Sequence, residues 1–195
     1  MKKLFLFATV LMFASGIFAQ QLSIGGQFGW GVPQGKAFEK ADGEKSSNGG
    51  LAFDVDALYH FGQLNNKLGV GITYNGSLLF GVSSSESSFD IGMYGLSLYG
   101  VKAYYKFLDM SVTPYVSLSA GLSQFSTPEV KMMGVVISEP QKASAFGIRP
   151  EVGINLGSFV ISAAYFVPAN YKLNEKTYSA GVFQVSLGFR KTFGL

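Results

Sequence analysis

Apolar side chains occupy every second position at the end of the chain. The segment 181–195 reads GVFQVSLGFRKTFGL, and its odd phase is apolar except at Lys191. A period of two residues is that of a β-strand, because successive side chains of a strand point to opposite faces. One face is apolar and the other small and polar, which suits a sheet that separates lipid from water. We therefore expect the chain to end in a membrane-spanning strand.

Seven further segments show the same alternation. They are 22–32, 49–61, 67–80, 93–107, 112–125, 143–156 and 159–167. The links between the eight segments are long and short in strict order, beginning with a long polar link at 33–48. Membrane barrels give this order because tight turns face the periplasm and longer loops face outward. The sequence predicts an all-β fold, an eight-stranded antiparallel up-and-down transmembrane β-barrel with both termini periplasmic.

Four places depart from the simple pattern. In 93–107 the apolar phase changes after Leu98, which predicts either a bulge or an extension of the strand above the membrane. The apolar run 130–137 predicts that the two flanking strands continue beyond the membrane as a hairpin. Pro150 lies in the lipid-facing phase and cannot donate to a ladder, which predicts a bulge or a lost hydrogen bond. The final long link, 168–180, is expected to be an outer loop.

Residues 1–19 have the order of a secretory signal: Lys2 and Lys3, an apolar core and a small-residue exit at Ala19. The apolar run is shorter than the roughly 20 residues that span a bilayer, which argues against an uncleaved anchor. We expect cleavage after Ala19 and one barrel domain over 20–195. Cleavage lowers the formal charge from +3 to +1, so the pI of 9.0 does not indicate a nucleic-acid partner. The chain has no cysteine, which excludes disulfides and thiolate metal sites.

Charged residues of both signs fall in the phase that faces the lumen. They are Asp54, Asp56, Lys102, Lys106, Arg149, Glu151 and Arg190. An eight-stranded barrel is only wide enough for side chains to fill it, so opposite charges are expected to pair. The favoured interpretation is a structural ion network that plugs the barrel. The alternative is a narrow or gated polar pore.

The sequence contains little that points to catalysis. His60 is the only histidine and is predicted at the periplasmic end of its strand, where no serine or acid is evident as a partner. Asp54 and Asp56 share one face of one strand, so they cannot flank a glycosidic bond. They are also too few to indicate a metal site. We expect no enzyme activity, no cofactor and no metal.

Aromatic residues make up 15% of the chain, and many lie near predicted strand ends. The candidates for an interfacial girdle are Trp30, Phe61, Phe80, Phe107, Phe159, Tyr165 and Phe193. Girdles of this kind form where the apolar band meets the polar headgroups. A sugar- or base-binding platform is the competing interpretation, but it would need aromatic residues gathered in the loops. Those predicted in loops are only Phe38, Phe89, Tyr171 and Tyr178.

These features, together with the stretch TPYVSLSAGL at 113–122, resemble the small outer-membrane β-barrel family of Gram-negative bacteria, which includes the OmpA transmembrane domain and OmpX. The resemblance covers the mature chain and implies outer-membrane lipid and the barrel assembly machinery as partners. It implies a structural, adhesive or surface-interaction role and no shared catalytic residue. The final aromatic residue that is usual in the family is displaced here, because Leu195 is last and Phe193 precedes it by two places.

The leading hypothesis is a non-enzymatic outer-membrane barrel that acts through four outer loops, with no ligand named by the sequence. A small pore and an outer-membrane lipid-modifying enzyme are the alternatives in the membrane. A soluble lipocalin-like barrel is the fourth hypothesis, and it would keep the apolar face inside.

Overall fold

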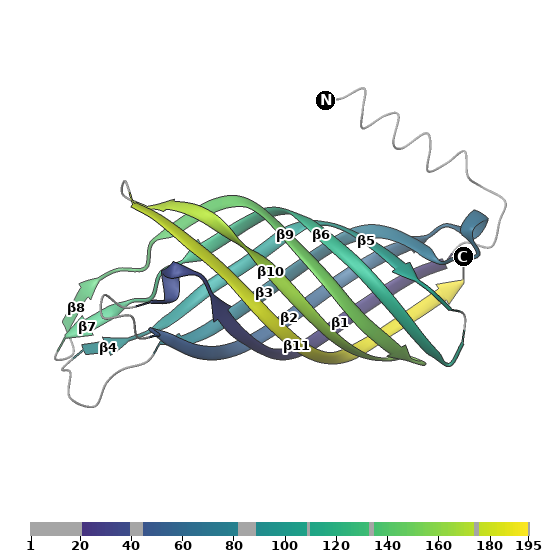
Figure 1. Ribbon diagram of the computed structural model, residues 1–195, viewed down its shortest axis with the longest axis horizontal. Helices are drawn as coiled ribbons and strands as arrows, with labels where there is room; N and C mark the ends of the chain where they lie inside the picture. Colours follow the sequence, from purple (N-terminus) through teal and green to yellow (C-terminus); the bar gives the residue numbers. More distant parts are fainter. Residues whose placement is uncertain are drawn as a thin grey trace, which may run out of the picture.

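Eight long antiparallel strands form a closed barrel in the computed structural model (Figure 1), which confirms the predicted fold class. The structure describes residues 21–39, 45–81, 89–108, 110–132, 135–173 and 176–194. The predicted signal at 1–19 and the terminal Leu195 lie outside these residues. Around the barrel the strand order is β1-β11-β10-β9-β6-β5-β3-β2. The strands are β1 (Gln21–Gln34), β2 (Ser47–His60), β3 (Leu68–Gly81), β5 (Met93–Lys106), β6 (Val112–Ser126), β9 (Lys142–Leu156), β10 (Phe159–Leu173) and β11 (Lys176–Gly194).

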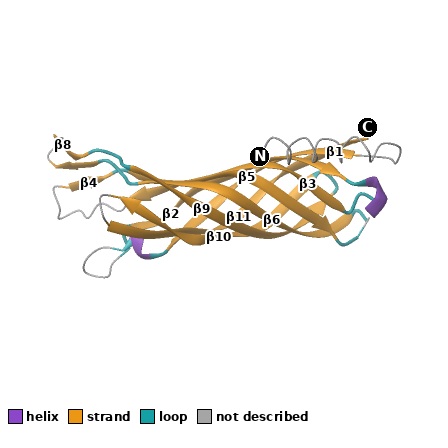
Figure 2. Ribbon diagram, turned by 90° about the horizontal axis from the view of Figure 1, so that it is seen from above, coloured by secondary structure: helices purple, strands orange, loops and turns teal. Residues whose placement is uncertain are grey.

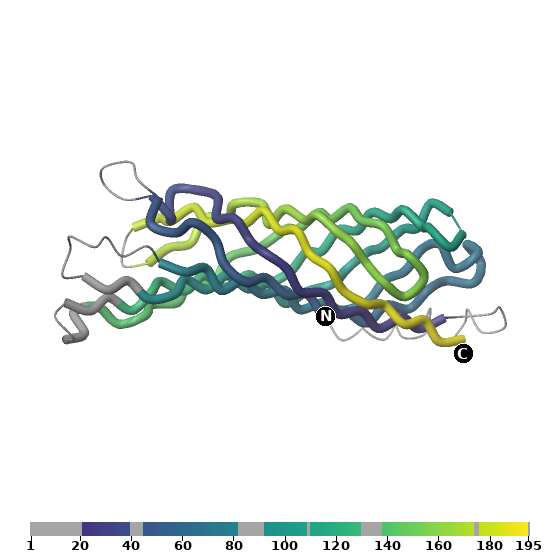
Figure 3. Tube along the Cα trace, turned by 90° about the horizontal axis from the view of Figure 1, so that it is seen from below, coloured from purple at the N-terminus to yellow at the C-terminus, as the bar shows by residue number. Residues whose placement is uncertain are grey.

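Strands β1 and β11 close the barrel by pairing from Gln21 with Gly194 to Gln34 with Gly181. Figure 3 shows these two strands, purple and yellow, running side by side along the wall. The beginning of β1 and the end of β11 therefore lie at one end of the barrel, which we call the termini end. The opposite end, with the links from β1 to β2, β3 to β5 and β6 to β9, is called the loop end.

Short 3-10 turns and strands lie at the two ends of the barrel (Figure 2). The 3-10 turn η1 (Lys36–Phe38) follows β1, and η2 (Gly62–Leu64) connects β2 to β3. Beyond the loop end, β4 (Phe89–Ile91), β7 (Val130–Met132) and β8 (Val135–Ser138) form a separate three-stranded sheet. β7 pairs with β8, so a hairpin is present as predicted, but it belongs to a separate sheet and does not continue β6 and β9. β4 was not predicted. No helix in the described part of the chain is long and apolar enough to cross a membrane.

The prediction that 168–180 forms an outer loop is wrong. Strand β10 continues to Leu173 and β11 begins at Lys176, so most of this segment is paired strand. The register of β10 against β11 shifts between Phe166 and Ala169, around Pro168. The extra residue of this bulge changes which phase points inward, from Phe166 before it to Tyr171 after it. Because the alternation changes phase at the bulge, the sequence pattern did not reveal that the strand continues beyond it.

Of the two explanations predicted for the pattern in 93–107, the bulge is wrong. Strand β5 keeps an unbroken register with β3 and with β6. One phase faces the interior along the whole strand, and its buried members are Tyr94, Leu96, Leu98, Lys102 and Tyr104. The chemistry of the interior changes along the barrel, from apolar near the loop end to charged further down. The change in sequence pattern therefore marks a change of interior environment rather than of backbone geometry.

Pro150 is exposed on the outer face of β9, in the lipid-facing phase that its position predicted. Its pairing with Leu118 of β6 lies in an unbroken register, so no bulge is present on that side. On the other side, the registered pairing of β9 with β10 ends at Glu151 and Ala164, one residue short of the proline. The missing N–H of proline is consistent with a ladder that stops at this position.

Large apolar side chains cover the outer wall. Phe146, Ile72 and Phe189 have exposed fractions of 69%, 68% and 67%, and many others of this kind are exposed by 40% or more. Charged and polar side chains such as Lys102 and Ser119 are fully buried inside. This arrangement is the reverse of a soluble protein and matches the outward apolar band of a membrane barrel. It disfavours the lipocalin-like hypothesis.

Candidate functional site

The candidate site is the barrel interior, because inward-facing positions of all eight strands converge there. Six of the seven charges predicted for the lumen meet in its middle: Asp54 and Asp56 from β2, Lys102 from β5, Arg149 and Glu151 from β9, and Arg190 from β11. None of the six is more than 6% exposed. We call them the charge network. It contains three acids and three bases, so its formal charge is zero.

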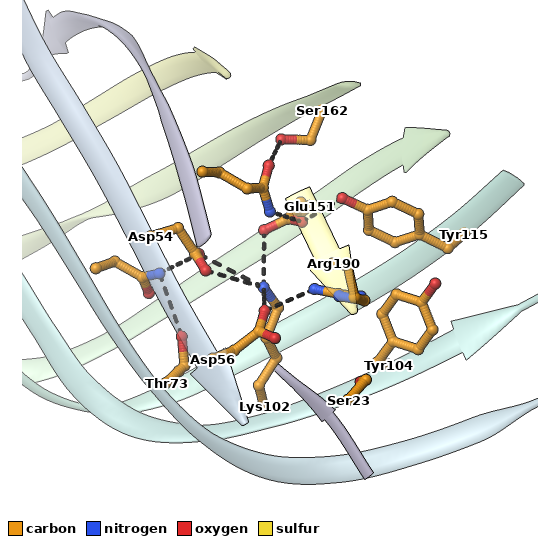
Figure 4. Close-up of polar contacts among 12 residues, drawn as sticks. Ser23, Asp54, Asp56, Thr73, Lys102, Tyr104, Tyr115, Glu151, Ser162 and Arg190 are labelled. Carbon is orange, nitrogen blue, oxygen red and sulfur yellow. Dashed lines mark hydrogen bonds and ion pairs between the residues drawn. The ribbon is translucent and has the colours of Figure 1, made fainter. Parts of the chain in front are cut away.

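Lys102 lies at the centre of the charge network (Figure 4). Its ammonium Nζ is 2.8 Å from Asp56 Oδ2, 3.2 Å from Glu151 Oε2 and 3.4 Å from Asp54 Oδ1. The whole Lys102 side chain is inaccessible to solvent. A buried ammonium needs compensating charge, and three surrounding carboxylates provide it.

The two arginines pair with the three carboxylates that surround Lys102. Arg149 Nη1 donates to Glu151 Oε2 at 2.7 Å and to Asp54 Oδ2 at 2.9 Å. Arg190 Nη2 donates to Asp56 Oδ2 at 2.7 Å. Every carboxylate therefore faces two of the three cations, and every pair joins different strands except that of Arg149 with Glu151.

Neutral side chains extend the charge network to the remaining strands. Tyr115 of β6 donates to Glu151 Oε1 at 2.7 Å, and Gln27 of β1 donates to the same oxygen at 3.2 Å. Ser162 of β10 donates to Gln27 Oε1 at 2.5 Å, while Asn75 of β3 donates to Asp54. The hydrogen bonds thus cross the interior and connect all eight strands. Sequence reasoning missed these neutral members, although their inward phase could have indicated them.

The geometry leaves the carboxylates little scope for other chemistry. Asp54, Asp56 and Glu151 are each held against lysine or arginine, so they do not form an open acid and base pair. Within the described residues, no group of three or more His, Asp or Glu side chains is arranged to hold a metal ion.

Lys106, the seventh predicted charge, lies apart from the charge network at the end of β5. It is half-buried and lines a small cavity at the termini end, together with His60 and Arg190. The structure therefore divides the predicted charges into a central group of six and one lysine near the rim.

His60 has a partner that the sequence did not reveal. Its Nε2 lies 2.8 Å from Ser23 Oγ, and its Nδ1 lies 3.2 Å from the carbonyl oxygen of Asn66. Pairing of β1 with β2 brings the serine and the histidine together although they are far apart in the sequence. Ser23 is completely buried, so a substrate cannot approach its hydroxyl in this arrangement. The contact satisfies two buried polar groups.

The loop end of the interior is filled by a cluster of apolar side chains. Phe38 from η1 is 2% exposed and packs edge-on against Tyr94 and Phe125, with ring centroids 5.3 and 5.9 Å apart. The other large members of this apolar plug are Leu79, Leu96, Leu98, Phe166, Tyr171, Leu173 and Val182. Phe38 lies in the link between β1 and β2, as predicted, but its side chain is buried inside the barrel. The loop predictions for Tyr171 and Tyr178 are wrong, because these residues lie in β10 and β11.

The predicted girdle aromatics lie on the outer wall in two groups. At the loop end, Trp30 and Phe80 are in contact, with ring centroids 6.1 Å apart. At the termini end lie Phe61, Phe107, Phe159 and Phe193. Tyr165 differs, because the extension of β10 to Leu173 leaves it in the middle of its strand.

A closed eight-stranded antiparallel barrel with an apolar exterior and a charged interior is the fold of the small outer-membrane barrels. Three solved structures of outer-membrane proteins are similar in fold to this chain over nearly their whole length. Ail, the attachment invasion locus protein of Yersinia pestis, is 18% identical, with a TM-score of 0.55 over 90% of this chain and 100% of that protein. Neisserial surface protein A is 16% identical, with a TM-score of 0.56 over 88% of this chain and 97% of that one. OprG from Pseudomonas aeruginosa is 15% identical, with a TM-score of 0.54 over 93% and 99%.

At these identities the likeness concerns the fold. No protein-family model matches the sequence, and no curated protein matches it either. The chain has the fold of the small outer-membrane β-barrels, and the roles of its loops and interior follow only from its own residues.

Proposed function

We propose that this protein is a non-enzymatic outer-membrane barrel with a plugged lumen, which acts by presenting its loop end to the cell's surroundings. The observation that carries this proposal is the filling of the interior. The charge network occupies the middle, and the apolar plug occupies the loop end. A polar pore would need a continuous path between side chains, whereas these layers leave buried groups in contact across the barrel.

The surface for interaction is the part of the chain beyond the loop end. It includes the β4-β7-β8 sheet, which lies outside the barrel wall in Figure 1 and makes no part of the closed sheet. Loops on a rigid barrel accept changes of sequence with little effect on the wall, so they are suited to carry binding.

In this proposal the termini end faces the periplasm and outer-membrane lipid covers the apolar wall. All three links at the termini end are short, whereas three of the four links at the loop end are longer, as expected if the termini end carries the periplasmic turns. The barrel assembly machinery would be a partner during insertion. The closing strand β11 offers it the exposed Phe193, which pairs with Leu22 of β1.

Single-cysteine labelling tests the orientation, since the natural chain has no cysteine. Glu139→Cys lies beyond β8 at the loop end, and Gln63→Cys lies in η2 at the termini end; both positions are exposed. In intact cells, a membrane-impermeant maleimide should label only Glu139→Cys, and lysis should make both variants equally reactive. If only Gln63→Cys is labelled in intact cells, the orientation is opposite to the one proposed. If both variants are labelled equally before lysis, neither end of the barrel is shielded by a membrane.

Planar bilayer recording tests the plug. The purified mature protein should insert without regular conductance steps, because the charge network and the apolar plug block the lumen. A porin recorded in the same membrane is the positive control for insertion and detection. Stable steps of uniform size with this protein would establish the pore hypothesis instead.

A further inference from the structure

A polar cavity opens at the termini end of the barrel, on the opposite side of the charge network from the apolar plug. Its volume is about 130 Å³, well above the roughly 10–15 Å³ needed for one water molecule. Residues at the ends of six strands line it, among them Gln21, His60, Lys106 and Thr192. The proposed function makes no use of this cavity.

The cavity is basic. Two cationic side chains, Arg190 and Lys106, are among its described lining residues, and no carboxylate is. The acid of the charge network that pairs with Arg190 is Asp56. Its Oδ2 accepts from Arg190 Nη2 and from Lys102 Nζ, and its Oδ1 has no hydrogen-bond partner among the described residues. Among the described lining residues, an anion entering the cavity would therefore meet two cationic side chains and no carboxylate.

Two nitrogens of the Arg190 guanidinium lack hydrogen-bond acceptors within the described part of the chain. Arg190 is only 6% exposed, yet its Nε and Nη1 have no hydrogen-bond partner among the described residues. A guanidinium carries five N–H donors, and buried polar groups normally find partners. Leaving such donors unpaired is costly, so the geometry favours a bound acceptor.

The guanidinium of Arg190 is held in place before any ligand arrives. Its Cζ lies 4.5 Å from the centre of the Tyr104 ring and 5.6 Å from that of Tyr115. The ion pair with Asp56 fixes its third nitrogen. Tyr104 accepts a hydrogen bond from Asn155 at 2.6 Å, so its own hydroxyl hydrogen is available as a further donor at the cavity wall. Fixed donors lose less entropy when a ligand binds.

We propose that this cavity is a binding site for a tetrahedral oxyanion, inorganic phosphate or the phosphate of a small monoester or lipid headgroup. Four oxygens around one centre can accept from Arg190, Tyr104 and Lys106 together, which a spherical halide cannot do with equal geometry. The compact, mostly buried position of the site suits a small anion rather than a polymer.

The test titrates inorganic phosphate, at constant ionic strength balanced with chloride, into the refolded mature protein in an uncharged detergent. The readout is the amide ¹H–¹⁵N shift of Gly157 and Thr192, both at the cavity. The shifts should saturate with phosphate. Arg190→Lys keeps a charge beside Asp56 but removes the spare donors, and it should weaken binding about tenfold or more, which is the value of one charge-assisted hydrogen bond.

Because the Arg190→Lys variant could fail to fold, a second variant at a less buried position tests the same site. Lys106→Gln at the cavity rim should weaken binding about fivefold through loss of one nearby charge. Lys142→Gln removes the same charge from an exposed position at the loop end and should leave binding unchanged. Phosphate shifts that do not saturate, or that respond equally to Lys106→Gln and Lys142→Gln, would overturn the proposal.

Two further arms identify the source of the anion. Glycerol 3-phosphate tests a soluble monoester, and nanodiscs of phosphatidylglycerol against phosphatidylcholine test a lipid headgroup. Saturating shifts with either soluble anion support a free ligand, whereas shifts in phosphatidylglycerol nanodiscs without added phosphate support the lipid. If the same amides respond in none of the arms, water alone fills the cavity and the site is refuted.

Discussion

Replacing Lys102 by methionine should lower the free energy of unfolding by about 3–5 kcal/mol, the usual cost of breaking a buried ion pair from one side. The substitution removes the ammonium that lies 2.8 to 3.4 Å from three carboxylates and leaves them with two arginines. Methionine has a similar length, so little of the effect should come from a cavity. The measurement is urea unfolding in lipid vesicles, followed by the fluorescence of Trp30, the only tryptophan.

Two controls separate charge from packing. Lys142→Met changes the same side chain at an exposed position of the loop end, where a lysine makes little contribution to stability, and its unfolding midpoint should match the natural protein. The double variant Lys102→Met with Asp56→Asn restores charge balance in the interior and should recover part of the lost stability. If Lys102→Met and Lys142→Met unfold at the same urea concentration, the charge network does not stabilise the barrel.

Replacing Phe38 by alanine should detach η1 from the barrel. The ring is the only buried side chain of this turn and packs on Tyr94 and Phe125, and deletion of a buried phenylalanine costs about 3 kcal/mol or more. Local opening should then expose the backbone at Lys36 and Lys45. Trypsin cleavage after these lysines should accelerate more than about tenfold, since each 1.4 kcal/mol of lost docking energy changes the open population tenfold.

The matched control is Phe80→Ala, which removes the same ring from the outer wall at the loop end, where it is 40% exposed. Cleavage after Lys36 and Lys45 should not change in this variant. Equal acceleration in both variants would mean that general loosening, rather than loss of the plug, exposes the loop. Phe38→Ala should also remain without steady conductance, because the charge network beneath the plug still blocks the lumen.

Much of the fold could be predicted because alternation is a local property. A strand between lipid and a polar interior must place unlike side chains on its two faces, as in β1 with Phe28 outside and Gln27 inside. The prediction was wrong where the environment was not uniform. The interior is apolar at Leu98 and charged at Lys102, so one continuous face of β5 looked like two.

The sequence predicted which charged residues lie in the barrel interior, but not which of them form ion pairs with one another. A charge such as Arg149 in the inward phase of a narrow barrel has to be buried near an opposite charge. Which carboxylate it meets depends on strand tilt and register, and these bring Asp54 of β2 within 2.9 Å of Arg149 across the barrel. The contact of Ser23 with His60 was missed for the same reason.

By itself, the sequence determined the number of strands in the barrel, the two faces of most of them and the set of charges that must lie inside. These depend on the period of the backbone and on the solvent each face meets, both of which are local. Only the tertiary structure decided that 168–180 is paired strand, that Phe38 returns from its loop to close the interior, and that Arg190 keeps unpaired donors at a cavity. Those outcomes depend on the closure of β1 against β11 and on the distances across the lumen, which no single strand contains.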